Sequence, residues 1–110
     1  PSFTDEAADS QLHFRVLRSD LDINGHVNNV VYAIWALETV SDKVATGNLK
    51  ELDMAFKSEA LYGNNILSLC KTSETDHSYQ CLHRIINEDD GRELARMKTV
   101  WKKPTKEAAP

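Results

Sequence analysis

The segment 20–26 concentrates side chains that take part in acid–base chemistry. It reads Asp-Leu-Asp-Ile-Asn-Gly-His, with Asp22, Asn24 and His26 at every second position. In an extended loop, side chains at alternate positions project to the same side. A carboxylate, an amide and an imidazole gathered in this way suit the attack of water on an acyl carbonyl.

A helix is expected directly after this segment. From Asn28 to about Val40 apolar residues recur at helical spacing with almost no polar interruption, so the helix is expected to be buried. Asn28 is a suitable N-cap. The N–H groups of Val27 and Asn28 would lie at the positive end of the helix. That end favours a neutral His26 and stabilises negative charge on a reacting oxygen.

Two other interpretations of the segment exist. Aspartate and asparagine commonly form turns and caps, so Asp20, Asp22 and Asn24 are equally consistent with a structural role. The spacing also matches the first half of a calcium-binding loop. That interpretation fails because the twelfth position is Val31 and because a strand, not a helix, is expected before the loop. We therefore expect no metal ion and no cofactor.

The remainder of the chain is typical of antiparallel strands. Residues of alternating polarity occupy one segment before the helix and four after it, at 11–18, 49–57, 66–72, 78–86 and 92–101. This order indicates an α+β domain in which a sheet wraps around one long helix, although the pattern does not choose among α+β topologies. We expect a linker or tail at 1–10, the domain at 11–103 and a flexible C-terminal tail at 104–110.

The amino-acid composition argues against several classes of function. With 110 residues, 41% hydrophobic and 27% charged, the chain is typical of one globular domain. No apolar run approaches the roughly 18 residues needed to cross a membrane. The net charge of −4 argues against nucleic acid as a partner. Cys70 and Cys81 lack metal or redox spacing and are expected to be buried thiols, which predicts a cytoplasmic protein.

Basic residues gather near the C-terminus. The segment 92–106 has one acid, Glu93, against six cations, which are Arg92, Arg96, Lys98, Lys102, Lys103 and Lys106. A solvated edge strand and tail explains this cluster, and so does a docking surface for an acidic partner.

The motif carries a family resemblance. The residues 19–29, Ser-Asp-Leu-Asp-Ile-Asn-Gly-His-Val-Asn-Asn, followed by Tyr32 and Trp35, resemble the signature of acyl-ACP thioesterases of bacteria and plant plastids. The similarity extends from about Phe14 to Trp101. It implies the hotdog fold, an antiparallel sheet wrapped around a central helix. It also implies hydrolysis of acyl-acyl carrier protein (ACP), which releases free fatty acid in fatty acid biosynthesis.

The resemblance also implies a set of catalytic residues. Asp22, Asn24 and His26 match the family's active-site motif, and Glu59, at the end of the strand after the helix, completes the set. By itself, Glu59 would be an ordinary exposed carboxylate. Plant members carry a cysteine directly after this glutamate, where this chain has Ala60. We therefore expect Glu59 to act as general base on a water. Asn24 would orient the water or carbonyl, and Asp22 and His26 would position and polarise it.

Partners follow from the same resemblance. Family members resemble two hotdog domains in tandem, and this chain resembles the C-terminal, catalytic one. We therefore expect it to pair with a second, N-terminal hotdog domain or to form a homodimer. Because ACP is generally acidic, the resemblance makes Arg92, Arg96, Lys98 and Lys102 candidate docking residues.

Two alternatives remain open at this point. A single-hotdog acyl-CoA thioesterase shares His-Val-Asn-Asn-x-x-Tyr but usually lacks an asparagine two positions before the histidine, so Asn24 favours ACP as the carrier. A non-catalytic acyl-binding or dimerisation module is the other alternative. The complete set of Asp22, Asn24, His26 and Glu59 argues against it.

Overall fold

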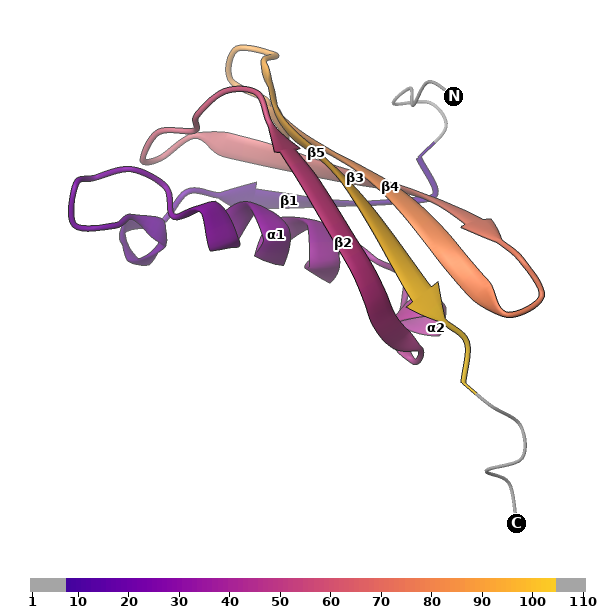
Figure 1. Ribbon diagram of the computed structural model, residues 1–110. Helices are drawn as coiled ribbons and strands as arrows, with labels where there is room; N and C mark the ends of the chain where they lie inside the picture. Colours follow the sequence, from indigo (N-terminus) through magenta and orange to yellow (C-terminus); the bar gives the residue numbers. More distant parts are fainter. Residues whose placement is uncertain (1–7, 105–110) are drawn as a thin grey trace.

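A single antiparallel sheet curves around one helix (Figure 1). The computed structural model describes residues 8–104. The elements are β1 (Ser10–Arg15), the 3-10 helix η2 (Arg18–Asp20), α1 (Asn29–Glu38), α2 (Asp42–Ala45), β2 (Asn48–Phe56), β3 (Asn65–Glu74), β4 (Ser78–Asn87) and β5 (Glu93–Lys102). The strand order is β1-β3-β4-β5-β2, and α1 contacts β1, β3, β4 and β5. The expected α+β arrangement is confirmed.

The N-terminal strand differs most from the expected boundaries. It begins at Ser10 and ends at Arg15, whereas the pattern predicted residues 11–18. The chain leaves the sheet there and forms η2, where the Asp20 carboxylate accepts the N–H of Leu17 (2.8 Å). Residues 8–10, predicted to belong to a tail, lie against the sheet, since the N–H of Asp9 donates to the Cys70 carbonyl (2.8 Å). The rest of the predicted tails, 1–7 and 105–110, lies outside the described residues.

The two ends of α1 are set by polar side chains. The amide oxygen of Asn28 accepts the N–H of Val30 (3.1 Å), which confirms the predicted N-cap. The helix ends at Glu38, two residues before the expected end, where the Thr39 hydroxyl donates to the carbonyl of Trp35 (2.7 Å). The periodicity did not predict α2, a single turn capped by Ser41. No helix within 8–104 is long and apolar enough to cross a membrane.

Only one side of α1 is covered. Tyr32 and Trp35 are buried against the sheet, but Val30 is 56% exposed and Ile34 49% exposed. The expectation that the helix is buried all round is therefore wrong for this chain. One curved sheet covers one face of a helix, and the opposite face stays open to solvent.

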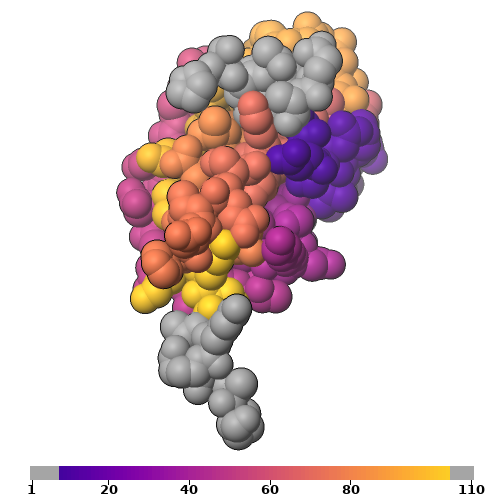
Figure 2. All heavy atoms as spheres, turned by 90° about the vertical axis from the view of Figure 1, so that its right-hand side faces the viewer, coloured from indigo at the N-terminus to yellow at the C-terminus, as the bar shows by residue number. Residues whose placement is uncertain are grey.

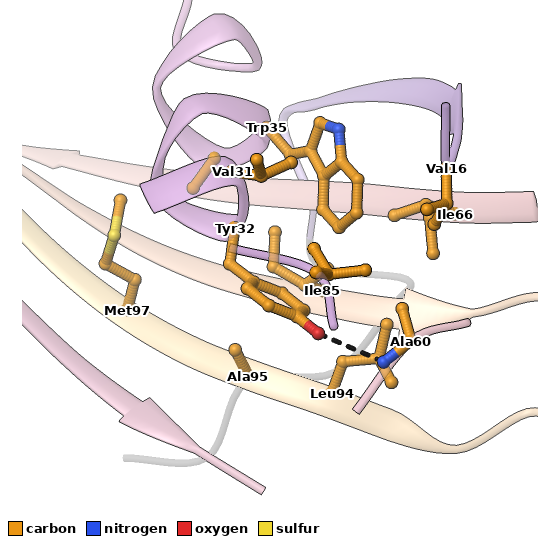
Figure 3. Packing of buried hydrophobic residues seen from close by; sticks show 12 residues of the cluster. Val16, Val31, Tyr32, Trp35, Ala60, Ile66, Ile85, Leu94, Ala95 and Met97 are labelled. Atoms are coloured by element: carbon orange, nitrogen blue, oxygen red, sulfur yellow. Dashed lines mark hydrogen bonds between the residues drawn. The ribbon is translucent and has the colours of Figure 1, made fainter. Parts of the chain in front are cut away.

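The main core lies between α1 and the sheet (Figure 3). The Tyr32 ring packs edge-on against Trp35 at 5.3 Å and against Phe56 of β2 at 5.5 Å between ring centroids. Figure 3 shows the Tyr32 hydroxyl reaching the N–H of Ala60, which follows β2. This core therefore joins α1 to the segment that carries Glu59.

A second, smaller core lies beyond the C-terminal end of α1. It contains Val40, Val44, Cys70, Tyr79, Cys81 and Trp101. Both cysteines are buried free thiols, as predicted. The neighbouring His83 is buried as well, and burial lowers its pKa to about 4, so its ring is neutral.

An apolar surface remains on the helix side of the sheet edge. Strand β2 pairs with β5 and lies at one end of the sheet. In the register of β2 and β5, Leu52 lies opposite Thr99 and Phe56 lies opposite Ala95. Leu52 and Phe56 therefore lie on the same face of the sheet that α1 covers at the neighbouring strands. Both side chains are exposed. The open side of α1 and this edge strand leave unpartnered apolar residues on the same face of the sheet.

Candidate active site

The loop between η2 and α1 is a tight turn. Leu21 and Val27 form an isolated antiparallel bridge, and the N–H of Asp22 donates to the carbonyl of His26 (2.7 Å). Gly25 takes the positive φ of 80° that closes such a turn. The expectation of an extended loop is therefore wrong, because the chain reverses direction within residues 22–26.

The carboxylate of Asp22 holds this turn together. Its Oδ1 accepts the backbone N–H of Asn24 (2.9 Å) and that of His26 (3.0 Å). These are the local bonds that aspartate makes in turns. Asp22 thus has a structural role in this loop, and it also faces the cavity described next.

An open cavity of about 600 Å³ lies beside the N-terminal end of α1. Its lining residues come from the turn, from the first turn of α1 and from the end of β2. They are Asp22, His26, Val27, Asn28, Asn29, Tyr32, Phe56, Lys57, Ser58 and Glu59. Of the expected catalytic set, the structure therefore brings Asp22, His26 and Glu59 to one cavity. Asn24 is exposed at the tip of the turn and does not line the cavity.

Glu59 is positioned by contacts on both sides along the chain. Ser58 donates from its N–H and from its hydroxyl to two carbonyls of β5 (3.2 and 2.8 Å). Ala60, which is buried, donates its N–H to the Tyr32 hydroxyl (3.0 Å). The carbonyl of Glu59 itself accepts from Arg92 Nη2 (3.2 Å). The backbone at Glu59 is therefore fixed from three directions while its side chain reaches the cavity.

Glu59 and His26 form a hydrogen-bonded pair. His26 Nδ1 lies 2.5 Å from Glu59 Oε1. The hydrogen bond and the charge of Glu59 raise the pKa of His26, and the charge of Asp22 adds to this effect. Both side chains are exposed to the cavity and to solvent. The expected influence of the helix, which favours neutral imidazole, is thus opposed by two carboxylates that favour the cation.

The helix N-terminus offers hydrogen-bond donors to the same cavity. The N–H of Asn28 is engaged, since it donates to the Asp20 carbonyl (2.9 Å). Within residues 8–104, the N–H groups of Val27 and Asn29 donate to no carbonyl or side chain. Val27 and Asn29 are therefore the backbone donors of this helix end that remain available to a ligand. Tyr32 also lines the cavity, and because burial raises the pKa of Tyr32, its hydroxyl stays protonated.

The basic segment approaches this site at Arg92. This guanidinium contacts the Glu59 carbonyl and pairs with Asp90 (2.6 Å between Nε and Oδ2). Arg96 pairs with Glu93 (2.9 Å), and the same carboxylate binds Arg84. Part of the positive charge is therefore neutralised within the chain.

The far end of the segment lies away from the cavity. Lys98 stands opposite Asp53 in the register of β2 and β5, and Lys102 stands opposite Asn48. Lys102 is ten positions from Arg92, about 33 Å at the rise of an extended strand. The four predicted docking residues therefore extend along the strand from Arg92, which contacts Glu59 beside the cavity, to Lys102 at the far end.

Comparison with known proteins identifies the family to which this chain belongs. A family model described as "Acyl-ACP thioesterase C-terminal domain" matches residues 3–103. This chain belongs to the acyl-ACP thioesterase family. The oleoyl-acyl carrier protein thioesterase 1 of Arabidopsis thaliana is 29% identical over 94% of the chain. The dodecanoyl-[acyl-carrier-protein] hydrolase of Cinnamomum camphora is 32% identical over 76% of it.

Solved structures of this family and of other thioesterases share the fold. The 12:0-ACP thioesterase from Umbellularia californica superposes with a TM-score of 0.82 at 28% identity, over 94% of this chain and 39% of that one. A 1,4-dihydroxy-2-naphthoyl-CoA thioesterase from Synechocystis gives 0.74 at 18% identity, over 84% of this chain and 80% of that one, which shows the hotdog fold alone. The chain spans only part of the length of these two curated relatives, 33% of the first and 22% of the second.

Two features of the site were not predicted from the motif. The ring of Tyr32 lies in the core, and its hydroxyl also accepts the N–H of Ala60, the residue after Glu59. The contact of Arg92 with the Glu59 carbonyl was not expected either. A tyrosine on an otherwise apolar helix face was the available signal, because a buried hydroxyl needs a hydrogen-bond partner.

Proposed function

We propose that this domain hydrolyses acyl-ACP thioesters and releases free fatty acids, with His26 and Glu59 as its catalytic pair. The observation that carries this proposal is the hydrogen bond between the two side chains at the cavity. Membership of the acyl-ACP thioesterase family and the names of the relatives support the choice of ACP as carrier.

The reaction begins with addition of water to the thioester carbonyl. Glu59 takes a proton from the water as its oxygen bonds to the carbonyl carbon. The oxyanion of the tetrahedral intermediate is stabilised by the N–H groups of Val27 and Asn29 at the helix N-terminus. Asn28 contributes as the N-cap that orders these groups, since its own N–H is occupied.

The second half of the reaction releases the thiol. The carbon–sulfur bond breaks, and protonated His26 gives its proton to the leaving thiolate. Glu59 then releases to solvent the proton that it took from water, and His26 takes up a proton at Nε2, which restores the starting pair. The products are a fatty acid and the thiol of the carrier. The nucleophile in this mechanism is water, because the residue after Glu59 is Ala60 and not the cysteine of the plant members.

Asp22 and Asn24 act in different ways in this proposal. Asp22 fixes the turn that presents His26 and adds to the field that favours its cationic form. Asn24 stands at the exposed tip of that turn, where it would meet the carrier arm of the substrate or a water at the entrance.

A second domain is proposed to complete the acyl pocket. Val30 and Ile34 of α1 and Leu52 and Phe56 of β2 are exposed apolar residues, and β2 is an edge strand of the sheet that residues 8–104 form. Exposed apolar surface next to an open strand edge marks an interaction site. A second hotdog domain or a second copy of this chain would cover it.

The carrier protein is proposed to dock along the basic segment. Arg92 would bind next to the cavity, whereas Arg96, Lys98 and Lys102 would extend the contact along β5. Acidic groups of the carrier would then guide its thioester towards His26 and Glu59.

The proposed cellular location follows from thiol chemistry. Cys70 and Cys81 are free and buried, which is usual in a reducing compartment. We propose the cytoplasm, whereas the plant relatives named above are chloroplastic proteins. A fluorescent fusion of the complete gene product tests this proposal.

Hydrolysis assays test the proposed function. The chain, alone and together with any sequence that precedes it in its gene, should release free thiol from acyl-ACP faster than from the matching acyl-CoA. Equal rates on both carriers would instead support an acyl-CoA thioesterase. If neither preparation turns over but acyl chains bind, the domain is a non-catalytic acyl-binding module.

A further inference from the structure

A second group of chemically competent side chains lies in the smaller core. Cys70 of β3 and Cys81 and His83 of β4 each offer one ligand atom, and these three atoms all lie within 4.8 Å of one another. All three residues are buried, and His83 is 2% exposed. Within residues 8–104 this is the only place where three such ligands gather.

The ring of His83 has an unused nitrogen in this core. Its Nε2 is hydrogen-bonded to the Thr99 hydroxyl (2.8 Å), which also accepts the indole N–H of Trp101 (2.9 Å). Its Nδ1 is buried and has no hydrogen-bond partner among the described residues. A buried polar atom without a partner costs free energy, so such an atom calls for an explanation. When His83 donates from Nε2 to Thr99, Nδ1 carries a free lone pair.

We propose that Cys70, Cys81 and His83 bind one thiophilic metal ion of the Zn²⁺ class. Two thiolates and a neutral imidazole are a donor set that such ions prefer. The ligand atoms of a tetrahedral zinc site lie about 3.7 Å apart, so small side-chain movements from the observed separations close the site. Binding releases the thiol protons to solvent, because thiolates are the ligands.

The fourth position of this site has a candidate as well. The Thr72 hydroxyl oxygen lies 3.8 Å from Cys70 Sγ and 3.6 Å from Cys81 Sγ. It therefore lies near both sulfurs, where it holds a water on the ion or takes the fourth position itself. Thr72 is partly exposed, whereas the cysteines are buried.

A disulfide fits the same residues less well. In the register of β3 and β4, Cys70 lies opposite His83, and Cys81 lies opposite Thr72. The two cysteines are therefore diagonal neighbours, whose Cα atoms are usually about 7–8 Å apart in antiparallel sheets. Disulfides need Cα atoms within about 6.8 Å. An ion bridges the longer separation without movement of the backbone.

The Thr72 end of the group lies near the surface and offers a route for the ion. The exposed carboxylate of Asp9 accepts the N–H of Thr72 (2.6 Å) and gives this end a negative charge. Figure 2 looks onto this end of the molecule and shows the β3–β4 hairpin, in salmon and orange, beside the first described residues in indigo. An ion that enters here joins β3 to β4 in the smaller core, whereas the catalytic cavity borders the main core. The site would therefore stabilise the fold rather than take part in hydrolysis.

Titration with Co²⁺ as a spectroscopic probe tests the proposal. The reduced, folded chain should bind one equivalent with a thiolate-to-cobalt charge-transfer absorption, and Zn²⁺ should displace it. Zn²⁺ at a hundredfold excess over its Kd should raise Tm by about 10 °C. The chain has two cysteines in all, so a charge-transfer band assigns the site to this core.

Substitutions distinguish metal binding at this site from adventitious metal binding at the surface. Cys70→Ala, Cys81→Ala and His83→Gln should each weaken Co²⁺ binding at least tenfold, whereas His77→Gln, an exposed histidine in the same hairpin, should bind as the unmodified chain does. Binding without a charge-transfer band would overturn the proposal, as would oxidation to a disulfide with no metal uptake. If one of these substitutions unfolds the chain, the Co²⁺ absorption spectrum of the unmodified chain alone tests the proposal.

Discussion

His26 Nδ1 and Glu59 Oε1 share a 2.5 Å hydrogen bond across 33 residues of sequence. The imidazole is presented by the turn before α1, and the carboxylate by the segment after β2. The Tyr32 hydroxyl joins these two regions through the N–H of Ala60. The geometry of the pair therefore depends on how α1 packs against the sheet.

Removal of the Glu59 carboxylate should stop catalysis with little effect on folding. Glu59→Gln should lower kcat by about 10²- to 10⁴-fold, the usual contribution of a general base. Tm should change little, because an exposed ion pair contributes little stability. Glu51→Gln, an exposed carboxylate on β2, is the matched control and should retain full activity. Near-normal turnover in Glu59→Gln would remove Glu59 from the mechanism.

The pH dependence should report the pair directly. The pKa of His26 is raised above 6.5 in the folded chain by its hydrogen bond to Glu59. The stability that the pair contributes is therefore fully present below about pH 6.5 and is lost as pH rises through the raised pKa. If protonated His26 assists the leaving thiolate, kcat falls over the same window. NMR titration of His26 should show its pKa returning towards 6.5 in Glu59→Gln, and an unchanged value would contradict the assignment.

Tyr32 should act as a positioning residue for Glu59. Tyr32→Phe keeps the ring that packs on Trp35 but leaves the buried N–H of Ala60 without an acceptor. We expect a loss of about 1–3 kcal/mol in the free energy of unfolding. We also expect a fall in kcat with KM nearly unchanged, because Glu59 loses an anchor. Tyr79→Phe, a buried tyrosine in the smaller core, is the control. Equal kinetic effects of Tyr32→Phe and Tyr79→Phe would show that Tyr32 acts only as a core residue.

Two glycines allow a matched test of the turn that presents His26. Gly25 and Gly91 have φ values of 80° and 78°, and a Cβ at either position meets no atom within 4 Å. Alanine should therefore cost about 1–2 kcal/mol of stability at each position, from backbone strain alone. Only Gly25→Ala should also lower kcat, because its turn carries His26. Chemical denaturation and steady-state assays on both variants check this, and equal kinetics would show that the turn geometry is unimportant.

The position of the docking surface can be tested by charge reversal. Arg92→Glu should raise KM for acyl-ACP roughly threefold to tenfold and weaken the dependence on salt. Lys102→Glu should have a smaller effect, because Lys102 lies about 33 Å along the strand from the Arg92 end. KM for acyl-CoA serves as the control and should respond less. Equal KM values for both variants and the unmodified chain would leave the segment as a solvated edge.

Much of the fold was predictable because its signals are local. The alternation of polarity located five strands, the apolar run located α1, and Asn28 marked its start. The residue types at 22, 26 and 59 matched a family motif, so the cavity residues were named before their positions were known. The short helices η2 and α2 were missed because single turns carry too little periodicity to detect.

The remaining features depend on contacts between distant parts of the chain. Local pattern indicated an extended loop at 22–26, but the bonds of Asp22 to two N–H groups reverse the chain and direct Asn24 away from the cavity. The sequence by itself determined which residues are chemically competent and which elements carry them. Only the tertiary structure decided that His26 meets Glu59, and that Cys70 and Cys81 meet His83. Pairing across strands and packing of α1 on the sheet set those distances, and neither is encoded in local spacing.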